Sequence, residues 1–175
     1  IILSVLPADF NVAVIIVTHT ASDGGNYLPA LLNKICALPV KEAIERESVL
    51  PGQVYLAPPN YHLLIESEYV FSLSIDERVC YVRPSIDVLF SSAADVYGPC
   101  LIGVILTGAN NDGEKGLEAV KLAGGYCFVQ DPDEAYAATM PTAASPFADI
   151  ILPAKQLAQE LVSFCRTMMK QKHDV

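Results

Sequence analysis

The sequence lacks the cysteine arrangements that most often indicate chemistry in a short chain. Its five cysteines are odd in number and widely spaced, and no CxxC pair occurs among them. Neither a zinc knuckle nor a redox motif is therefore indicated. Most of the cysteines are expected to be buried core thiols. Free thiols of this kind favour a reducing, cytoplasmic location.

The chain also lacks a long apolar run and an excess of basic residues. No stretch approaches the about 20 apolar residues needed to cross a bilayer, and no signal peptide is visible, so no membrane insertion is expected. Lys and Arg number 11 against 20 Asp and Glu, a net charge of −9. This balance argues against a nucleic-acid partner. With 175 residues, 52% of them hydrophobic, the sequence predicts one globular domain.

The most informative stretch is Leu101–Gly116, LIGVILTGANNDGEKG. Its first part, Leu101–Leu106, is uninterrupted and apolar, which predicts a central strand of a parallel sheet covered on both faces. The loop Thr107–Gly113 follows and opens a helix, at the strand end where open α/β sheets place their sites. Asp112 in this loop then has two interpretations: a helix cap or a functional carboxylate.

The remaining pattern predicts a doubly wound, mainly parallel α/β sheet flanked by helices in three layers, with an antiparallel hairpin. Further parallel strands are expected at Val12–Val17, Val40–Ala43, Tyr126–Gln130 and Ile150–Leu152. An antiparallel set is expected from Val54–Ala57, His62–Glu66 and Tyr69–Ser74. Helices are expected at Asn26–Ala37 with Leu28, Leu31, Leu32 and Ile35 on its apolar face, after the N-cap Ser85, at Gly116–Leu122, after Met140 and at Lys155–Lys170.

The three histidines occupy different kinds of position. His19 comes just after the strand Val12–Val17, at the edge where α/β sites are built, although many such histidines only form a hydrogen bond within a loop. His62 lies in the antiparallel set, where a structural role is expected. His173 lies in the C-terminal tail and is expected to be inert.

His19 and Asp112 together supply two members of a nucleophilic triad. Both follow strands predicted to end at the same sheet edge, and an Asp behind an imidazole fixes its tautomer while the imidazole carries the proton. The nucleophile is the missing member, because no GxSxG elbow occurs in the sequence. Ser22 lies near His19 but in a loop without a strained turn, and Ser4 lies in a helical pattern.

Five segments occur in the order found in the catalytic domain of the CheB family, the chemotaxis protein-glutamate methylesterases, and the chain resembles that domain over nearly its whole length. The segments are Val17–Thr20 (VTHT), Pro51–Leu63 (PGQVYLAPPNYHL), Arg83–Ala94 (RPSIDVLFSSAA), Gly103–Leu117 (GVILTGANNDGEKGL) and Met140-Pro141. The resemblance implies a doubly wound α/β fold. It also implies hydrolysis of glutamyl methyl esters, and deamidation of glutamines, on the cytoplasmic domain of methylated chemoreceptors. It implies no metal or organic cofactor.

The resemblance also assigns roles to residues. The catalytic His of the family is matched by His19 and its catalytic Asp by Asp112, and the loop before that Asp makes Ala109 and Asn110 candidates for the oxyanion site. Backbone N–H groups suffice for that role, although a methionine often stands in the family where Ala109 is. Arg83 is a candidate for positioning the acidic substrate region, with a salt bridge that ties down its loop as the alternative.

The departure from the family lies at the front of the chain. The family nucleophile is a Ser in a GxSxGG-like loop between the first strand and the first helix, and Ile1–Leu6 matches the later part of that helix. We therefore expect residues 1–175 to be one CheB-type domain truncated at its N-terminus, without a receiver domain, whose Ser lies upstream of Ile1. The alternative is a non-catalytic receptor-binding or scaffold module. A nucleotide or phosphate binder is disfavoured because GxGxxG and GKS/T are absent.

Overall fold

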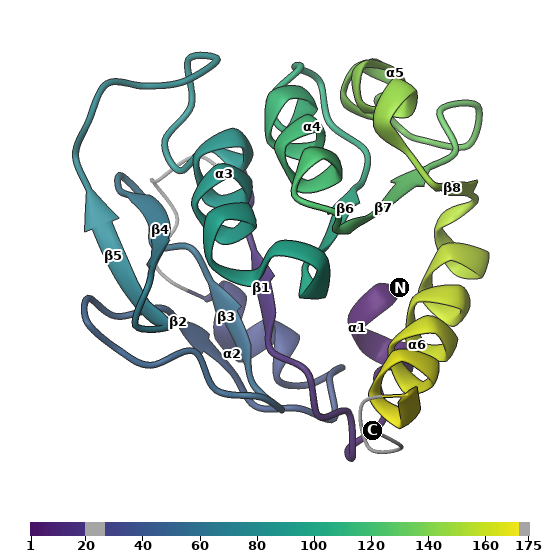
Figure 1. The fold of residues 1–175 in the computed structure, drawn as a ribbon, viewed down its shortest axis with the longest axis horizontal. Coiled ribbons are helices and arrows are strands. Elements are labelled where there is room, and N and C mark those ends of the chain that lie inside the picture. Colours follow the sequence, from purple (N-terminus) through teal and green to yellow (C-terminus); the bar gives the residue numbers. More distant parts are fainter. Residues whose placement is uncertain (20–26, 172–175) are drawn as a thin grey trace.

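The computed structural model describes residues 1–19 and 27–171 as two parallel sheets and a hairpin packed among helices (Figure 1). The first sheet has the order β1 (Val14–Ile16), β3 (Val54–Leu56), β2 (Val40–Glu42). The second has the order β6 (Ile102–Ile105), β7 (Tyr126–Gln130), β8 (Ile150–Leu152), and β4 (His62–Glu66) pairs antiparallel with β5 (Val70–Ser74). The predicted α/β fold with an antiparallel hairpin is confirmed.

Helices cover the sheets on both faces (Figure 1). They are α1 (Ile2–Val5), α2 (Leu28–Leu32), α3 (Ile86–Tyr97), α4 (Glu114–Leu122), α5 (Thr139–Ala144) and α6 (Ala154–Gln171), with single turns at Gly98–Cys100 and Ser145–Phe147. Helices α1 and α6 pack on each other on one side, and α3 packs on α4 on the other. Strand β3 shows why both faces are covered. Val54 and Leu56 enter the core beneath α1 and α6, whereas Tyr55 enters the core beneath α3.

The strand β3 corrects one expectation. Val54–Ala57 was predicted to join an antiparallel set, but Val54 pairs in parallel with both Val14 and Val40. The reason is burial on both faces, since every residue of β3 is buried, as in the centre of a parallel sheet. The nearby Pro-Pro-Asn turn connects β3 to the hairpin without pairing it to β4.

The helix predicted at Asn26–Ala37 is shorter and less amphipathic than expected. It ends at Leu32, and only Leu28 and Leu32 of the predicted apolar face pack against the core. Leu31 and Ile35 are 56% and 50% exposed. The side chain of Asn33 explains the early end, because it donates to the Val40 carbonyl at 2.7 Å and accepts from the Val40 amide at 2.8 Å, which ties the chain to β2.

Helices α3 and α4 meet so closely that a glycine is required between them. A Cβ on Gly116 would lie 2.7 Å from the Phe90 Cβ and 2.9 Å from the Asp87 Cα. Just before α4, Gly113 has φ 104°, a conformation that L side chains rarely adopt. These two glycines let the start of α4 lie against the start of α3, where the candidate site is built.

Each of the two parallel sheets has an outer strand, β1 or β6, that borders the same hydrophobic core. β1 is an outer strand of the first described sheet and β6 an outer strand of the second. Leu101–Leu106 was expected to be central, yet β6 pairs only with β7 among the described strands. Ile102 of β6 packs in the same core cluster as Val14 and Ile16 of β1, so the two edges are neighbours.

The cysteines are less buried than expected. Only Cys127 and Cys165 are buried, whereas Cys36 and Cys80 are half-buried and Cys100 is exposed. The expectation that most are core thiols is therefore wrong, because the three others lie in loops and turns. Burial raises the pKa of both Cys127 and Cys165 to about 11, which keeps these thiols protonated.

No helix among the described residues combines the length and the apolar character that crossing a membrane requires.

Candidate active site

The predicted pair His19 and Asp112 meets at the carboxyl edge of the sheets. The His19 Nε2 lies 2.9 Å from the Asp112 Oδ2. His19 follows β1 and Asp112 follows β6, so this contact joins the ends of two strands that belong to different described sheets. The side chain of His19 is 19% exposed and that of Asp112 is fully buried. The pair thus has a carboxylate behind an imidazole that solvent and substrate can reach.

Asp112 is held by the N-terminus of α3 as well as by His19. Its Oδ1 accepts from the Ser85 Oγ at 2.7 Å and from the Asp87 amide at 3.1 Å, and its Oδ2 accepts from the Ile86 amide at 2.6 Å. With His19 these make four donors to one carboxylate. Asp112 was predicted as either a helix cap or a functional carboxylate. It does cap a helix, but that helix is α3 and not the one it precedes.

These donors keep Asp112 charged despite its burial. Burial alone raises the pKa of a carboxyl group, but the hydrogen bonds from His19, Ser85 and the amides of Ile86 and Asp87 outweigh it and lower the pKa of Asp112 below 3.8. The carboxylate is therefore ionised at neutral pH. A charged, immobile acceptor fixes the imidazole of His19 in one orientation.

Asp87 caps the N-terminus of α4 in the same way as Asp112 caps the N-terminus of α3. Its Oδ1 accepts from the Gly113 amide at 2.9 Å and the Gly116 amide at 2.7 Å, so the first turn of α3 caps α4 while Asp112, just before α4, caps α3. Burial and the neighbouring Asp112 raise the pKa of Asp87, against the lowering effect of the two amides. The sequence pattern predicts Ser85 as an N-cap, but it does not predict that Ser85 and the Asp87 amide bind Asp112. Their signal was the Ser-x-Asp spacing at the start of a predicted helix.

The orientation of His19 determines which of its nitrogens can act. With the Nε2–H donating to Asp112, the neutral imidazole carries its lone pair on Nδ1. A nucleophile near Nδ1 could pass its proton there, and Asp112 would stabilise the resulting imidazolium. Such an arrangement supports acyl transfer by a Ser or Cys that lies outside this pair.

The CheB methylesterase family model matches residues 1–161, which include both members of the pair. The chain belongs to the CheB methylesterase family. Its fold agrees with the crystal structure of the CheB methylesterase catalytic domain from Thermotoga maritima, with a TM-score of 0.88 and 32% sequence identity. That comparison covers 93% of this chain and 88% of the Thermotoga chain.

Curated relatives extend the family match to proteins of two lengths. A relative from Leptospira interrogans is 44% identical over 173 residues, which are 98% of this chain and 90% of that protein. A relative from Rhodospirillum rubrum named protein-glutamate methylesterase/protein-glutamine glutaminase 2 is 36% identical over 166 residues. Those residues are 92% of this chain but only 46% of that protein. The chain therefore spans most of the first CheB relative and about half of the second.

The described candidates Ser4, Ser85 and Cys80 do not supply a nucleophile to the CheB pair. The exposed Ser4 donates its hydroxyl to the Ile1 carbonyl at 2.8 Å within α1, and Ser22 lies outside the described residues. Ser85 is fully buried and its hydroxyl donates to Asp112. Burial and the charges of Asp112 and Asp87 raise the pKa of Cys80, the opposite of what activates a thiol.

The loop that precedes Asp112 has two consecutive amides without a partner in the part of the chain that the structure describes. Ala109 is exposed, and the amides of Ala109 and Asn110 form no hydrogen bond with another described residue. The Asn110 Oδ1 instead accepts from the Asp112 amide at 3.1 Å, which shapes the loop. Behind it, Gly108 exchanges hydrogen bonds with Ala137 and Met140, each at 3.0 Å. The free N–H groups suit an oxyanion site.

Arg83 ties down a loop, but it forms no salt bridge with another described residue, which was the alternative role considered for it. Its Nη1 donates to the carbonyl oxygens of Ile75 and Asp76, at 2.6 and 2.8 Å. The buried His62 adds a second tie, since its Nε2–H donates to the Glu77 carbonyl at 3.0 Å. This contact supports the structural role expected for His62. Together the two side chains fix the segment 75–84 beside the pair.

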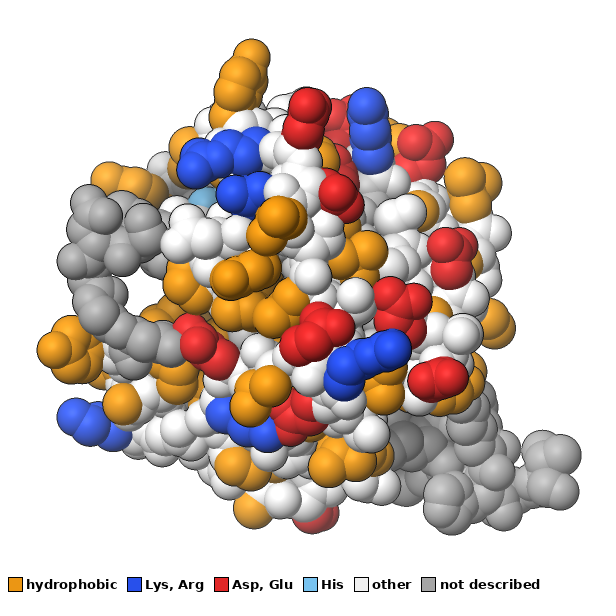
Figure 2. Space-filling view, turned by 90° about the vertical axis from the view of Figure 1, so that its left-hand side faces the viewer, with side chains coloured by type: hydrophobic (Ala, Val, Ile, Leu, Met, Phe, Trp, Pro, Cys, Tyr) orange, Lys and Arg blue, Asp and Glu red, His pale blue; other side chains and the backbone are white. Residues whose placement is uncertain are grey.

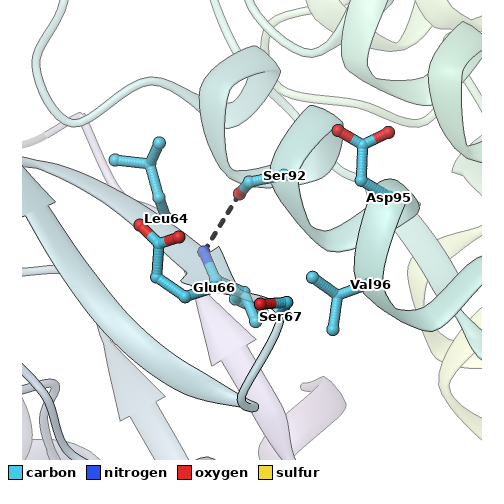
Figure 3. A pocket seen from close by; sticks show the side chains of 7 residues that line it. Leu64, Glu66, Ser67, Ser92, Asp95 and Val96 are labelled. Atoms are coloured by element: carbon cyan, nitrogen blue, oxygen red, sulfur yellow. Dashed lines mark hydrogen bonds between the residues drawn. The ribbon is translucent and has the colours of Figure 1, made fainter.

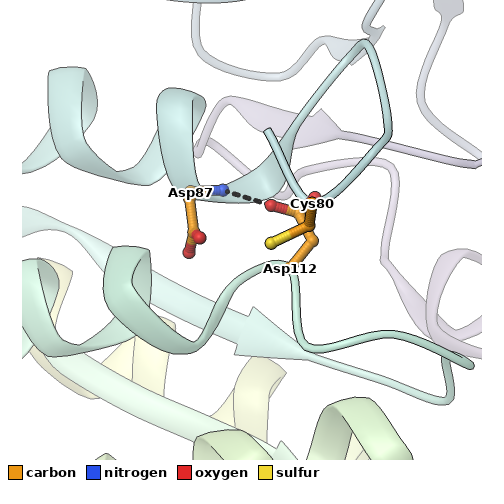
Figure 4. A group of neighbouring side chains, drawn as sticks. All are labelled: Cys80, Asp87 and Asp112. Carbon is orange, nitrogen blue, oxygen red and sulfur yellow. Dashed lines mark hydrogen bonds between the residues drawn. The ribbon is translucent and has the colours of Figure 1, made fainter. Parts of the chain in front are cut away.

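Cys80, Asp87 and Asp112 form a cluster that has the residue types of a metal site. One ligand atom from each lies within 4.8 Å of the others (Figure 4). The carboxylates are already used, because Asp112 accepts four hydrogen bonds and the Asp87 Oδ1 accepts two amides. A protonated thiol is also a poor ligand. The geometry therefore fits reciprocal helix capping better than metal binding.

A separate pocket of about 410 Å³ lies between the β4–β5 hairpin and α3 (Figure 3). Its lining residues are Leu64, Ile65, Glu66, Ser67, Ser92, Asp95 and Val96. Within it Ser92 accepts from the Ile65 amide at 3.1 Å and donates to the Leu89 carbonyl, which fastens the hairpin to the helix. None of its lining residues belongs to the His19–Asp112 pair.

Proposed function

We propose that this chain is the catalytic domain of a protein-glutamate methylesterase that acts on glutamyl methyl esters of methylated chemoreceptors in the cytoplasm. Deamidation of glutamine side chains is included, because both reactions pass through the same acyl chemistry. The observation that carries the proposal is the 2.9 Å contact between His19 and the ionised Asp112 in a CheB-family fold.

The steps follow from the geometry of the pair. A serine hydroxyl attacks the ester carbonyl and passes its proton to the His19 Nδ1, and His19 then gives that proton to the departing methoxide, which leaves as methanol. Water cleaves the acyl-enzyme by the same route and releases the glutamate side chain. Asp112 orients His19 and stabilises the imidazolium throughout. The amides of Ala109 and Asn110 receive the developing oxyanion.

Arg83 serves substrate positioning through the loop that it holds. Its bonds to the Ile75 and Asp76 carbonyls keep the segment 75–84 next to the pair, where a protein substrate must pass.

The serine is proposed to lie upstream of Ile1, on a loop after a further parallel strand. The neighbouring edges of β1 and β6 support this placement, since a strand inserted between them would join the two sheets and end next to His19 and Asp112. Pairing both edges would also satisfy their free backbone groups.

The test is methanol release from a methylated chemoreceptor fragment by the protein that includes the segment before Ile1. We expect His19→Ala to lower the rate by at least about 10³-fold, as loss of a triad member does elsewhere. Ser4→Ala is the matched control and keeps the wild-type rate. A serine-directed fluorophosphonate, followed by peptide mapping, should label a serine upstream of Ile1. Equal rates for wild type and His19→Ala, or a label at Ser4 or Ser22, would contradict the assignment.

A further inference from the structure

A tight turn beside the catalytic pair projects a tyrosine into solvent. Val79 and Val82 form an antiparallel bridge in which each amide donates to the other residue's carbonyl, at 3.2 and 2.9 Å. Cys80 and Tyr81 form the two-residue connection between them. Tyr81 is 93% exposed. Figure 2 shows the side of the molecule on which β5 and the loop after it lie in Figure 1, with hydrophobic and charged side chains interspersed on that face.

The turn holds its two central residues in an unfavourable backbone conformation. Cys80 has φ 50° and Tyr81 has φ 66°. Two-residue hairpin turns with positive φ at both positions favour Asn-Gly, and a residue such as Tyr is energetically unfavourable there. Because the Tyr81 ring is exposed, packing against the rest of the chain does not offset this unfavourable conformation. Its presence is explained if the ring packs against a partner.

The turn is rigid because its flanks are fastened to the hairpin and to itself. Arg83 donates to the Ile75 and Asp76 carbonyls, and His62 donates to the Glu77 carbonyl. A fixed aromatic side chain gives contact area at low entropic cost, which is why tyrosine is enriched among the residues that dominate binding.

The turn also lies within reach of anything that brings a glutamyl side chain to His19. The Cys80 Sγ is within 4.8 Å of an Asp112 carboxylate oxygen, and Asp112 contacts His19 at 2.9 Å. Tyr81 is the next residue, about 3.8 Å along the chain. A helix with its side chains is about 10–12 Å wide, so a folded segment seated at His19 extends over a distance comparable to that between His19 and the turn.

We propose that the Val79–Val82 turn is a docking contact for the protein substrate, with Tyr81 as its aromatic anchor. This inference rests on the proposed function, since it assumes that the substrate is a protein. The loop carries Asp76, Glu77, Arg78 and Arg83, so its net charge is zero. The contact is therefore made by the ring rather than by electrostatic attraction.

The experiment uses the protein that includes the segment before Ile1 and compares Tyr81→Asn with Tyr81→Phe on two substrates. Asn tolerates positive φ and so keeps the turn while removing the ring, whereas Phe keeps the ring and removes only the hydroxyl. On a methylated chemoreceptor fragment we expect Tyr81→Asn to lower kcat/KM about tenfold or more, mainly through KM, and Tyr81→Phe to stay near wild type. On p-nitrophenyl acetate, which is too small to reach the turn, both variants keep the wild-type rate.

Three outcomes overturn the inference: Tyr81→Asn equals wild type on the receptor fragment, both variants lose activity equally, or Tyr81→Asn also loses activity on the small ester. The last result would mean that the turn acts on the catalytic pair. Calorimetric titration of the receptor fragment separates this inference from the proposed function. If wild type binds the fragment but hydrolyses neither substrate, the proposed function fails. In that case weaker binding of the fragment by Tyr81→Asn still supports the docking contact, and equal binding refutes it.

Discussion

At the scale of single residues, the proposed catalytic carboxylate forms catalytic and structural contacts with the same oxygen atoms. Asp112 orients His19 and also receives Ser85 and two amides from the start of α3. The bonds that lower its pKa are thus partly structural bonds. Asp87, a few ångströms away, has its pKa shifted upward and accepts two amides on a single oxygen. The two aspartates therefore respond differently to the same substitution.

Asp112→Asn and Asp87→Asn test this difference directly. An Asn at 112 must turn its NH₂ toward N–H or O–H donors on one side, so we expect a stability loss of about 1–3 kcal/mol and a fall in kcat of about 10³- to 10⁴-fold. An Asn at 87 keeps its oxygen for Gly113 and Gly116, so we expect a stability change within about 1 kcal/mol. Urea unfolding at pH 7 measures the stability of both variants, and methanol release measures kcat. Asp87→Ala is the comparison variant, because it loses both hydrogen bonds to the Gly113 and Gly116 amides.

The same pair gives a pH dependence with a defined sign. The folded-state pKa of Asp112 lies below 3.8, so its ionisation stabilises the fold above pH 3.8, and this contribution is lost as the pH falls through the folded pKa. The pKa of Asp87 is raised in the folded state. Its contribution to stability is therefore present below pH 3.8 and is lost as the pH rises through the folded-state pKa. Unfolding curves between pH 2.5 and 5 should therefore show a shallower loss of stability for Asp112→Asn than for wild type, and an unchanged slope would contradict this account.

At the scale of elements, the site depends on how α3 and α4 meet. The N-terminus of each helix is capped by an aspartate from the N-terminal region of the other helix. Gly116 lets the two helices approach until Asp87 reaches the α4 amides. The site is therefore a property of the helix pair, since neither helix alone holds the carboxylate in position.

Gly116→Ala should separate the two helices. The added methyl group would lie 2.9 Å from the Asp87 Cα, which is backbone and cannot rotate away. We expect a loss of about 1–3 kcal/mol and a melting temperature several degrees lower. Glu118→Ala, at an exposed position of α4, is the matched control and should melt within about 2 °C of wild type. Equal melting temperatures for the two variants would show that the helices shift without cost.

At the scale of the whole molecule, the two sheets share a hydrophobic core and also meet at the candidate site. β1 and β6 are outer strands of their described sheets, yet His19 and Asp112 beyond their ends are in contact. The proposed upstream strand between them would make one continuous parallel sheet whose carboxyl edge carries all three members of the triad.

Hydrogen exchange tests that arrangement. In the protein that includes the segment before Ile1, we expect the amides of Val14–Ile16 and Ile102–Ile105 to exchange at least about 100-fold more slowly than in residues 1–175 alone, because a paired strand protects its neighbours. The amides of β4 and β5 serve as the internal reference and should change little. Unchanged exchange in both β1 and β6 would place the upstream segment elsewhere.

The sequence alone determined the features that depend on local patterns. Val12–Val17 and Leu101–Leu106 predicted strands because continuous apolar runs require burial on both faces, and β1 and β6 lie within them. The positions of His19 and Asp112 just beyond those strands predicted their contact, because parallel strands end at one edge of a sheet. The motif order identified the family for the same reason, as each motif sits at a strand end or a helix start.

The tertiary structure alone decided what depends on partners distant in the chain. It placed β3 between β1 and β2, exposed Leu31 and Ile35, and turned Arg83 toward backbone carbonyls. It also made Asp112 the cap of α3 rather than of α4. Strand pairing and the direction of a side chain are set by which surfaces remain to be buried after the chain has collapsed. Local periodicity carries no information about that choice.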